Sequence, residues 1–187
     1  MSPLLTPEDA TRGLRRMAGQ IVEELRGTDR LLLVGVRRGG EPVAQHLAEL
    51  LAAETGNRPP VGSVDISLYR DDASTALPNP RIGPTRLPVE IEKYRVLLCD
   101  DVLFTGRTIR AAVDALLDYG RPSQVRLAVL LDRDGRELPI QADYRLQKVN
   151  VSSDCRVDVV YSEGRFSAYA VPGTSPTYAP PPTAENP

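Results

Sequence analysis

Apolar runs that alternate with amphipathic segments constrain the fold of this chain most strongly. Residues 31–36 (LLLVGV) and 95–99 (RVLLC) precede segments with helical spacing of apolar residues at 41–54 and 106–119, and residues 124–131 form a further strand-like run. A run that is apolar at nearly every position is typical of a strand covered on both faces. Strands that alternate with helices indicate a parallel sheet. We therefore predict an α/β fold with a central, mainly parallel sheet flanked by helices.

The N-terminal segment carries the signals of a helix start. Thr6 is a capping residue, Pro7 suits the first helical position, and acidic residues follow in the first turn. Apolar residues then recur at helical spacing, and Gly27 is a suitable stop. We predict a helix between these two signals.

The segment after the second predicted helix is less regular. Residues 61–69 (VGSVDISLY) are predicted to form another strand, whereas residues 70–88 are rich in proline and charge. Loops of this length are typical of lids, binding loops or disordered segments. Towards the C-terminus, residues 156–161 and 165–170 are predicted to pair as a hairpin. We expect one domain over residues 1–171.

Composition narrows the function classes. The chain has 187 residues, a formal net charge of −2, 5% aromatic residues and no tryptophan. These values argue against wholesale electrostatic binding to nucleic acid, although they leave room for a local basic patch. The sequence contains neither a signal-peptide core nor a long apolar stretch, so we expect a cytoplasmic protein without a membrane span. The proline-rich tail at 172–187 is predicted to be disordered.

The two cysteines, Cys99 and Cys155, indicate no disulfide framework and have no metal-type neighbour at a suitable spacing. Cys99 lies in an apolar run, and we interpret it as a small core residue.

The stretch CDDVLFTGRT at 99–108 carries the clearest chemistry. Asp100 and Asp101 stand at the expected carboxyl end of a strand, and a short loop then leads into a predicted helix. A ligand crevice in a parallel sheet lies at that end. A helix N-terminus exposes backbone N–H groups, Gly106 permits close approach, and threonine hydroxyls can donate, so the loop suits a phosphate. The Walker pattern is absent, which disfavours nucleotide triphosphate hydrolysis.

The paired acids fit a sugar phosphate as the ligand. Carboxylates accept hydrogen bonds from ribose hydroxyls, and a divalent cation would offset their repulsion. The alternative is that Asp100 caps the turn and Asp101 faces solvent.

The stretch VLLCDDVLFTGRT (96–108) resembles the 5-phosphoribosyl-1-pyrophosphate (PRPP) signature of type I phosphoribosyltransferases. The resemblance implies that fold, with a small hood and a flexible lid loop at 70–88. It implies that Asp100 and Asp101 hold the ribose hydroxyls, near Mg²⁺ carried by PRPP, and that residues 105–108 bind the 5-phosphate. The PRPP-binding residues implied by this motif are Asp100, Asp101, Val102, Leu103, Phe104, Thr105, Gly106, Arg107 and Thr108.

The stretch VGVRRGG at 34–40 resembles the pyrophosphate loop of the same family, which implies that Arg37, Arg38 and Gly39 contact PRPP. The alternative is an ordinary turn with surface arginines. Asp100, Asp101 and Arg38 are the implied catalytic residues. Sugar transfer of this kind is expected to pass through an oxocarbenium-like state. Catalysis would then come from charge stabilisation with Mg²⁺, without a histidine base.

Two further stretches narrow the resemblance to one branch. VDISLYRDD (64–72) and LDRDGRELPIQADY (131–144) resemble the bacterial pyrimidine operon regulators that also have uracil phosphoribosyltransferase activity. This resemblance extends over about residues 21–160. It implies that Arg133 contributes to the substrate site, that residues 132–160 form the hood, and that Val157 approaches the nucleotide. The only histidine, His46, is interpreted as a partly exposed helix residue.

The chain departs from this branch in the hood and in the pyrophosphate loop. The regulators usually read DRGHREL, whereas this chain reads DRDGREL at 132–138, and a later GKN is absent. The usual Thr-Arg-Gly of the pyrophosphate loop is Arg37-Arg38-Gly39 here. The two hood changes touch a surface associated with RNA binding.

The resemblance implies two activities. The enzyme would convert uracil and PRPP into UMP and diphosphate with Mg²⁺. The regulator would bind pyrimidine-operon leader mRNA when UMP is bound, as a homodimer or higher oligomer. The basic residues predicted to contact RNA are Arg12, Arg15, Arg16, Arg136, Arg145 and Lys148. The alternatives are a solvated helix face in place of an RNA surface, and transfer to another pyrimidine or to a purine in place of uracil.

Overall fold

A computed structural model of the chain describes residues 3–67 and 85–173. The tail after residue 173 and most of the predicted lid loop lie outside these ranges. The elements in chain order are α1 (Pro7–Leu25), β1 (Leu31–Val36), α2 (Gly40–Thr55), β2 (Val61–Val64), the 3₁₀ turn η2 (Ile91–Lys93), β3 (Arg95–Leu103), α3 (Arg107–Leu117), β4 (Gln124–Arg133), β5 (Tyr144–Val149), β6 (Cys155–Ser162) and β7 (Arg165–Pro172).

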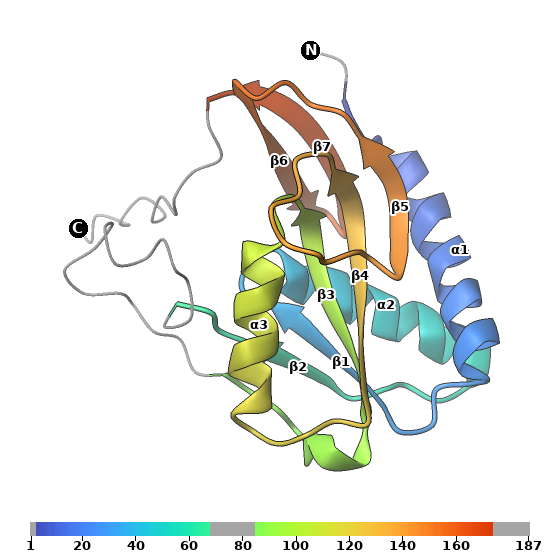
Figure 1. The fold of residues 1–187 in the computed structure, drawn as a ribbon. Helices are drawn as coiled ribbons and strands as arrows, with labels where there is room; N and C mark the ends of the chain where they lie inside the picture. The colour runs from blue at the N-terminus through green and yellow to red at the C-terminus, as the bar shows by residue number, and fades with distance from the viewer. Residues whose placement is uncertain (1–2, 68–84, 174–187) are drawn as a thin grey trace, which may run out of the picture.

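Five strands of the described ranges form one sheet in the order β2-β1-β3-β4-β5, and every neighbouring pair is parallel (Figure 1). β3 is central, and every residue of β1 is buried because helices cover both faces of the sheet. The predicted α/β fold with a mainly parallel sheet is confirmed. The carboxyl ends of β1, β3 and β4 meet at one edge, where the candidate site lies.

Two apolar cores lie on opposite faces of the sheet. α1 and α2 pack on one face in a cluster that also contains Phe166 and Ala168 of β7. α3 packs on the other face together with Ile91 of the 3₁₀ turn. Cys99 is fully buried in the first core, as predicted. No helix in the described part of the chain is long and apolar enough to cross a membrane.

The first helix begins and ends where the sequence predicts. Thr6 Oγ1 accepts the N–H of Asp9 at 3.1 Å, and Pro7 is the first helical residue. At the other end Arg26 adopts a left-handed conformation, and the Gly27 N–H donates to Val22 O at 2.9 Å. This arrangement satisfies carbonyl groups of the last helical turn.

The C-terminal hairpin is also confirmed. β6 and β7 pair antiparallel from Cys155 opposite Pro172 to Ser162 opposite Arg165. The two residues between the strands, Glu163 and Gly164, both have positive φ, which suits the right-handed twist of the strands. The ladder continues to Pro172, one residue beyond the domain boundary predicted from the sequence.

Several strand boundaries differ from the predictions. β3 extends past residue 99 to Leu103, because β4 continues to pair with it. β2 ends at Val64, whereas the sequence predicted a strand over residues 61–69. Ser63 of β2 forms a bridge with Arg86, so the end of the 70–88 segment lies against this edge of the sheet. β5 was not predicted.

The contact between α1 and β5 depends on a helix residue without a side chain. A Cβ on Gly13 would lie 2.6 Å from Leu146 Cγ, whereas a Cβ on Gly19 of the same helix would meet only Glu54 Oε1 at 3.6 Å. Gly13 therefore lets the helix approach the edge strand closely, and Gly19 has no such role.

These two glycines give a matched stability test. Gly19→Ala should stabilise the protein by about 1 kcal/mol through helix propensity. Gly13→Ala gains the same propensity but overpacks Leu146, which typically costs about 1–3 kcal/mol. Urea unfolding should therefore show Gly13→Ala to be less stable than Gly19→Ala, and Leu146→Ala should reduce that difference. Equal stabilisation by both substitutions would contradict this packing.

Candidate functional site

The two adjacent acids lie inside the end of β3. Asp100 is 5% exposed and pairs with Val129 in the β3–β4 ladder. The Asp101 N–H donates to Asp100 Oδ1 at 3.0 Å, and the Val102 N–H donates to Asp101 Oδ1 at 2.7 Å. Burial, together with the charge of Asp101, raises the pKa of Asp100 well above its usual range, and burial also raises the pKa of Asp101. The protein thus holds two carboxyl groups where their charged forms are disfavoured until a ligand compensates them.

The turn between β1 and α2 lies directly against these acids. A Cβ on Gly39 would overlap the carboxylate of Asp101, and a Cβ on Gly40 would overlap the carbonyl of Cys99. The close approach is possible because neither residue has a side chain. The predicted pyrophosphate loop and the predicted ribose ligands are therefore neighbours in the structure.

The two arginines of this turn differ in their surroundings. The Arg37 N–H donates to Val64 O at 3.0 Å, and Arg37 Nε lies 3.5 Å from Glu41 Oε1. Arg38 is exposed, and the peptide bond between Arg37 and Arg38 is cis. The turn is thus anchored to β2 while it presents basic side chains at the sheet edge.

The loop after β3 leads into the N-terminus of α3. Gly106 has a φ of +93° and immediately precedes the helix, and its carbonyl accepts the N–H of Arg110 at 2.9 Å. Thr105 Oγ1 accepts the N–H of Arg107 at 3.3 Å. The amide groups and dipole of a helix N-terminus attract an anion. The predicted 5-phosphate loop therefore begins within a few residues of the acid pair.

Arg133 is buried at the end of β4, with 2% of its surface exposed. Its guanidinium carbon lies 4.1 Å from the ring centre of Phe104, and Nη2 donates to Ser152 O at 2.9 Å and to Val151 O at 3.3 Å. Its Nε has no hydrogen-bond partner among the described residues. Arg133 thus connects Phe104, in the loop after β3, with the segment that precedes β6.

One charged pair near the site was not predicted. Val157 of β6 packs against the first core, whereas its neighbour Asp158 lies close enough for its charge to help raise the pKa of Asp101. Arg156 holds the Asp158 carboxylate with Nε at 2.8 Å and Nη2 at 3.0 Å. The alternation of polar and apolar residues at 156–159 was the available signal, because it places positions 156 and 158 on one face.

Basic residues of α1 and β5 lie on adjoining elements. Arg12 and Arg16 are exposed on α1, and Arg16 Nη2 donates to Leu146 O of β5 at 3.3 Å. Arg145 and Lys148 of β5 are exposed as well. The structure therefore brings these four predicted RNA contacts to neighbouring surfaces.

The other two predicted RNA contacts are Arg15, next to Arg16 on α1, and Arg136, which shares the Asp132 carboxylate with Arg145. Arg15 is close to His46 of α2, whose pKa is lowered mainly by burial and further by the charge of Arg15. As predicted, His46 is a half-buried helix residue, and its ring meets Phe166 edge-on at 5.9 Å. Arg136 donates to Phe104 O and to the Asp132 carboxylate, so its side chain is held beside the phosphate loop.

Comparison with known proteins agrees with this arrangement. The model of the phosphoribosyl transferase domain family matches residues 4–163, and the chain therefore belongs to that family. The chain is 48% identical over 154 residues to the bifunctional protein PyrR of Bacillus cereus (strain B4264), and the match covers 81% of this chain and 86% of the relative. The same values hold for PyrR of Bacillus anthracis (strain A0248). Within the family, the chain lies in the PyrR branch.

Solved structures support the fold at lower identity. A hypoxanthine phosphoribosyltransferase of Trypanosoma cruzi has a TM-score of 0.67 and 20% identity, with 90% of this chain and 95% of that chain covered. A hypoxanthine-guanine phosphoribosyltransferase of Bacillus anthracis has a TM-score of 0.61 and 18% identity, with 80% and 84% covered. The chain has the type I phosphoribosyltransferase fold.

The burial of Asp100 predicts an unusual dependence of stability on pH. Because the pKa of Asp100 is higher in the folded than in the unfolded protein, stability falls as pH rises through the range between these two values. Asp100→Asn keeps the Oδ1 acceptor and removes the charge, so it should raise the melting temperature at pH 8, where each kcal/mol corresponds to about 2–4 °C. The gain should shrink as the pH falls towards 4, where about half of the unfolded carboxyl groups are protonated.

Scanning calorimetry of the unliganded protein at pH 4, 6 and 8 measures this effect. Asp114→Asn is the matched control, because Asp114 is exposed on α3 in a surface pair with Arg110. A loss of stability in Asp100→Asn at pH 8 would contradict the burial argument.

Proposed function

We propose that this protein transfers the phosphoribosyl group of PRPP to uracil, forming UMP and diphosphate, and that with UMP bound it attaches to leader mRNA of a pyrimidine operon and attenuates transcription. The observation that carries the enzymatic half is the adjacent pair of buried Asp100 and partly buried Asp101, with Gly39 packed against Asp101 and the phosphate loop following the pair in the chain. Three sets of groups thus adjoin one another: acceptors for ribose hydroxyls, donors for a phosphate, and a basic turn for diphosphate.

Each part of the site has a distinct role in this proposal. Asp100 and Asp101 accept hydrogen bonds from the ribose hydroxyls, and residues 105–108 donate to the 5-phosphate. The bond between C1 of ribose and the diphosphate oxygen breaks as the bond to uracil N1 forms, and the proton of that nitrogen passes to the diphosphate or to water. Positive charge on the ribose is stabilised by the carboxylates, and negative charge on the leaving diphosphate is stabilised by Arg38 and the amides of its turn.

The acid pair also fits Mg²⁺ that arrives with PRPP. Within the described residues no group of three or more His, Cys, Asp and Glu side chains could hold a metal ion alone. Mg²⁺ commonly binds one or two carboxylates and completes its shell with substrate phosphates and water. Asp100 and Asp101 would supply those carboxylates, and the ion would neutralise the charge of the diphosphate.

Uracil is the proposed base because the 48% identity is to PyrR proteins. The likeness to the hypoxanthine enzymes is limited to the fold, at 20% identity or less in the two structures compared. The protein is further proposed to act in the cytoplasm as a homodimer or higher oligomer.

An assay of UMP formation from uracil and PRPP tests the enzymatic half. The folded protein should form UMP only with Mg²⁺ present, and Asp101→Asn should lower kcat/KM by about 100-fold or more, since it weakens charge stabilisation at the ribose. Asp114→Asn should leave kcat/KM unchanged. A folded wild-type protein that makes no UMP, or an Asp101→Asn variant with full activity, would refute the assignment.

The regulatory half rests on the basic surface of α1 and β5. Arg12 is 73% exposed and pairs with Asp9 of its own helix, while Arg16 contacts the backbone of β5. Together with Arg145 and Lys148, these residues form a surface that can neutralise several phosphates of a transcript.

Filter binding with the host's pyrimidine leader RNA, with and without UMP, tests the regulatory half. UMP should raise the affinity, and Arg16→Ala and Lys148→Ala should each weaken binding and reduce the slope of log K against log salt by about 1. Arg58→Ala, an exposed arginine that pairs with Gln45, is the control and should change neither. An RNA affinity that does not change with UMP, or that is equal for unrelated RNA, would refute this half of the proposal.

A further inference from the structure

The segment that follows β4 is fastened to the phosphate loop by main-chain hydrogen bonds. We call residues 134–140 the hood strap and residues 104–108, which include the predicted 5-phosphate contacts, the phosphate loop. The carbonyl of Thr105 accepts the N–H of Glu137 at 2.9 Å and the N–H of Leu138 at 3.1 Å. The Glu137 carboxylate also pairs with Arg107 Nε at 2.6 Å. The hood strap therefore holds the loop at its backbone and at its surface.

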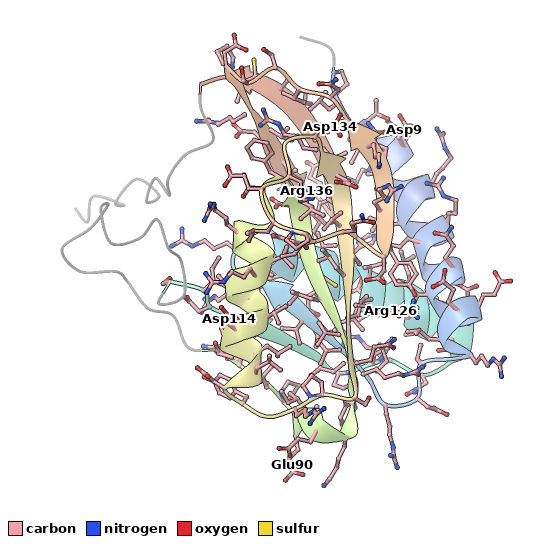
Figure 2. All side chains as sticks on the ribbon, in the orientation of Figure 1. Asp9, Glu90, Asp114, Arg126, Asp134 and Arg136 are labelled. Atoms are coloured by element: carbon pink, nitrogen blue, oxygen red, sulfur yellow. The ribbon has the colours of Figure 1, made fainter. Side chains whose placement is uncertain are left out.

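The side chain of Arg136, in the hood strap, holds the carbonyl of Phe104, the residue before Thr105. Arg136 Nη1 donates to the carbonyl of Phe104, and Nη2 donates to the buried carboxylate of Asp132 at the end of β4. Arg145 lies farther away, with Nη1 3.7 Å from Asp132 Oδ2. Asp132 thus anchors Arg136, and Arg136 anchors the phosphate loop. Figure 2 shows Arg136 on the loop that crosses near the carboxyl ends of β3 and β4.

Packing leaves this arrangement little freedom. A Cβ on Gly135 would overlap the ring of Phe104, so the strap lies directly on that ring. A Cβ on Gly106 would lie 3.4 Å from the side chains of Leu138 and Ile140, which is tighter than usual. The hood strap therefore packs directly against the phosphate loop.

The hydrogen bonds accepted by these two carbonyls determine the direction of the N–H groups that follow them in the phosphate loop. In a trans peptide unit the C=O and N–H bonds point in opposite directions. The carbonyls of Phe104 and Thr105 are both turned towards the hood strap, so the N–H groups of Thr105 and Gly106 are turned away from it. Amides oriented this way, next to the N-terminus of α3, are the donors that a phosphate requires.

We propose that Arg136 is a positioning residue for the 5-phosphate: anchored by Asp132, it fixes the carbonyl of Phe104 and so keeps the loop amides aimed at the phosphate. This inference rests on the proposed function, because it assumes that the loop binds the 5-phosphate. The planar guanidinium suits the role, since it donates to a carbonyl and a carboxylate at once. A lysine is a point donor and would hold these two acceptors less well.

The test compares the affinities of UMP and uridine by isothermal titration calorimetry. The ratio of the two dissociation constants isolates the contribution of the phosphate group to the binding affinity. In Arg136→Met the UMP affinity should fall about tenfold or more, as expected for misplaced binding groups, while the uridine affinity changes less than about threefold. Arg136→Lys should give an intermediate ratio. With PRPP as substrate, KM should rise more than kcat falls.

Arg126→Met is the matched control. Arg126 lies towards the opposite end of β4, pairs with Glu24 at 2.8 Å, and has a side chain 27% exposed against 25% for Arg136 (Figure 2). Its loss should leave the UMP to uridine ratio unchanged. A change equal to that of Arg136→Met would attribute the effect to general destabilisation and overturn the inference.

The remaining outcomes separate the inference from the proposed function. If the wild-type protein binds UMP no more tightly than uridine, the phosphate site itself is wrong. If the wild-type protein prefers UMP and folded Arg136→Met keeps that preference, or loses affinity for both ligands equally, the positioning role is wrong. Should Arg136→Met fail to fold, the ratio measured for Arg136→Lys decides in the same way.

Discussion

The burial of one carboxyl group, with a second, partly buried one beside it, at the end of the central strand is the constraint around which this structure is arranged. Asp100 and Asp101 can be held there only because β4 continues to pair with β3, and because Gly39 and Gly40 leave space beside them. Burial raises the pKa of both groups, so the unliganded protein carries an electrostatic cost at this edge of the sheet. In the proposed function a ribose with its accompanying cation would relieve that cost, so that the site trades stability for binding.

The second organising feature is that the proposed sites for the ribose and for the 5-phosphate lie close together in the chain. The phosphate loop follows the acids directly in the chain, and the hood strap closes over it through Arg136 and Glu137. The buried carboxylate of Asp132 also attracts Arg145, which stands on the strand that carries part of the basic surface. The phosphate loop, the hood strap and β5 are thus joined by one short network of charges, and the sheet edge that carries the acid pair adjoins the surface proposed for RNA.

Much of this architecture was predictable from local patterns. Apolar runs gave the strands of the sheet centre, Thr6 and Pro7 marked the first helix, and the PRPP signature located the acids and the loop. These features are readable because each depends on neighbouring residues or on strong periodicity. The family and the branch suggested by the motifs agree with the comparisons.

The remaining features depend on contacts between distant residues. β5 was missed because its sequence YRLQKV has exposed polar residues between Tyr144 and Val149, the pattern of an edge strand that α1 covers. The extension of β3 depends on pairing with β4, which no local pattern reports. Arg136 was predicted to contact RNA, because the sequence does not show that its side chain donates to Phe104 O and to the Asp132 carboxylate. Asp158 enters the site only because the hairpin lies near the end of β3.

The central claim is that Asp100 and Asp101 bind the ribose hydroxyls of the nucleotide. The most direct test measures the affinities of UMP and of 2′,3′-dideoxy-UMP for the wild-type protein and for Asp101→Asn by calorimetry. The account predicts that removing the hydroxyls weakens binding to the wild-type protein by about tenfold or more, since hydrogen bonds to charged groups are worth about 1.5–3 kcal/mol each. It also predicts that Asp101→Asn discriminates between the two ligands much less. Equal affinity of the wild-type protein for both ligands would contradict the account.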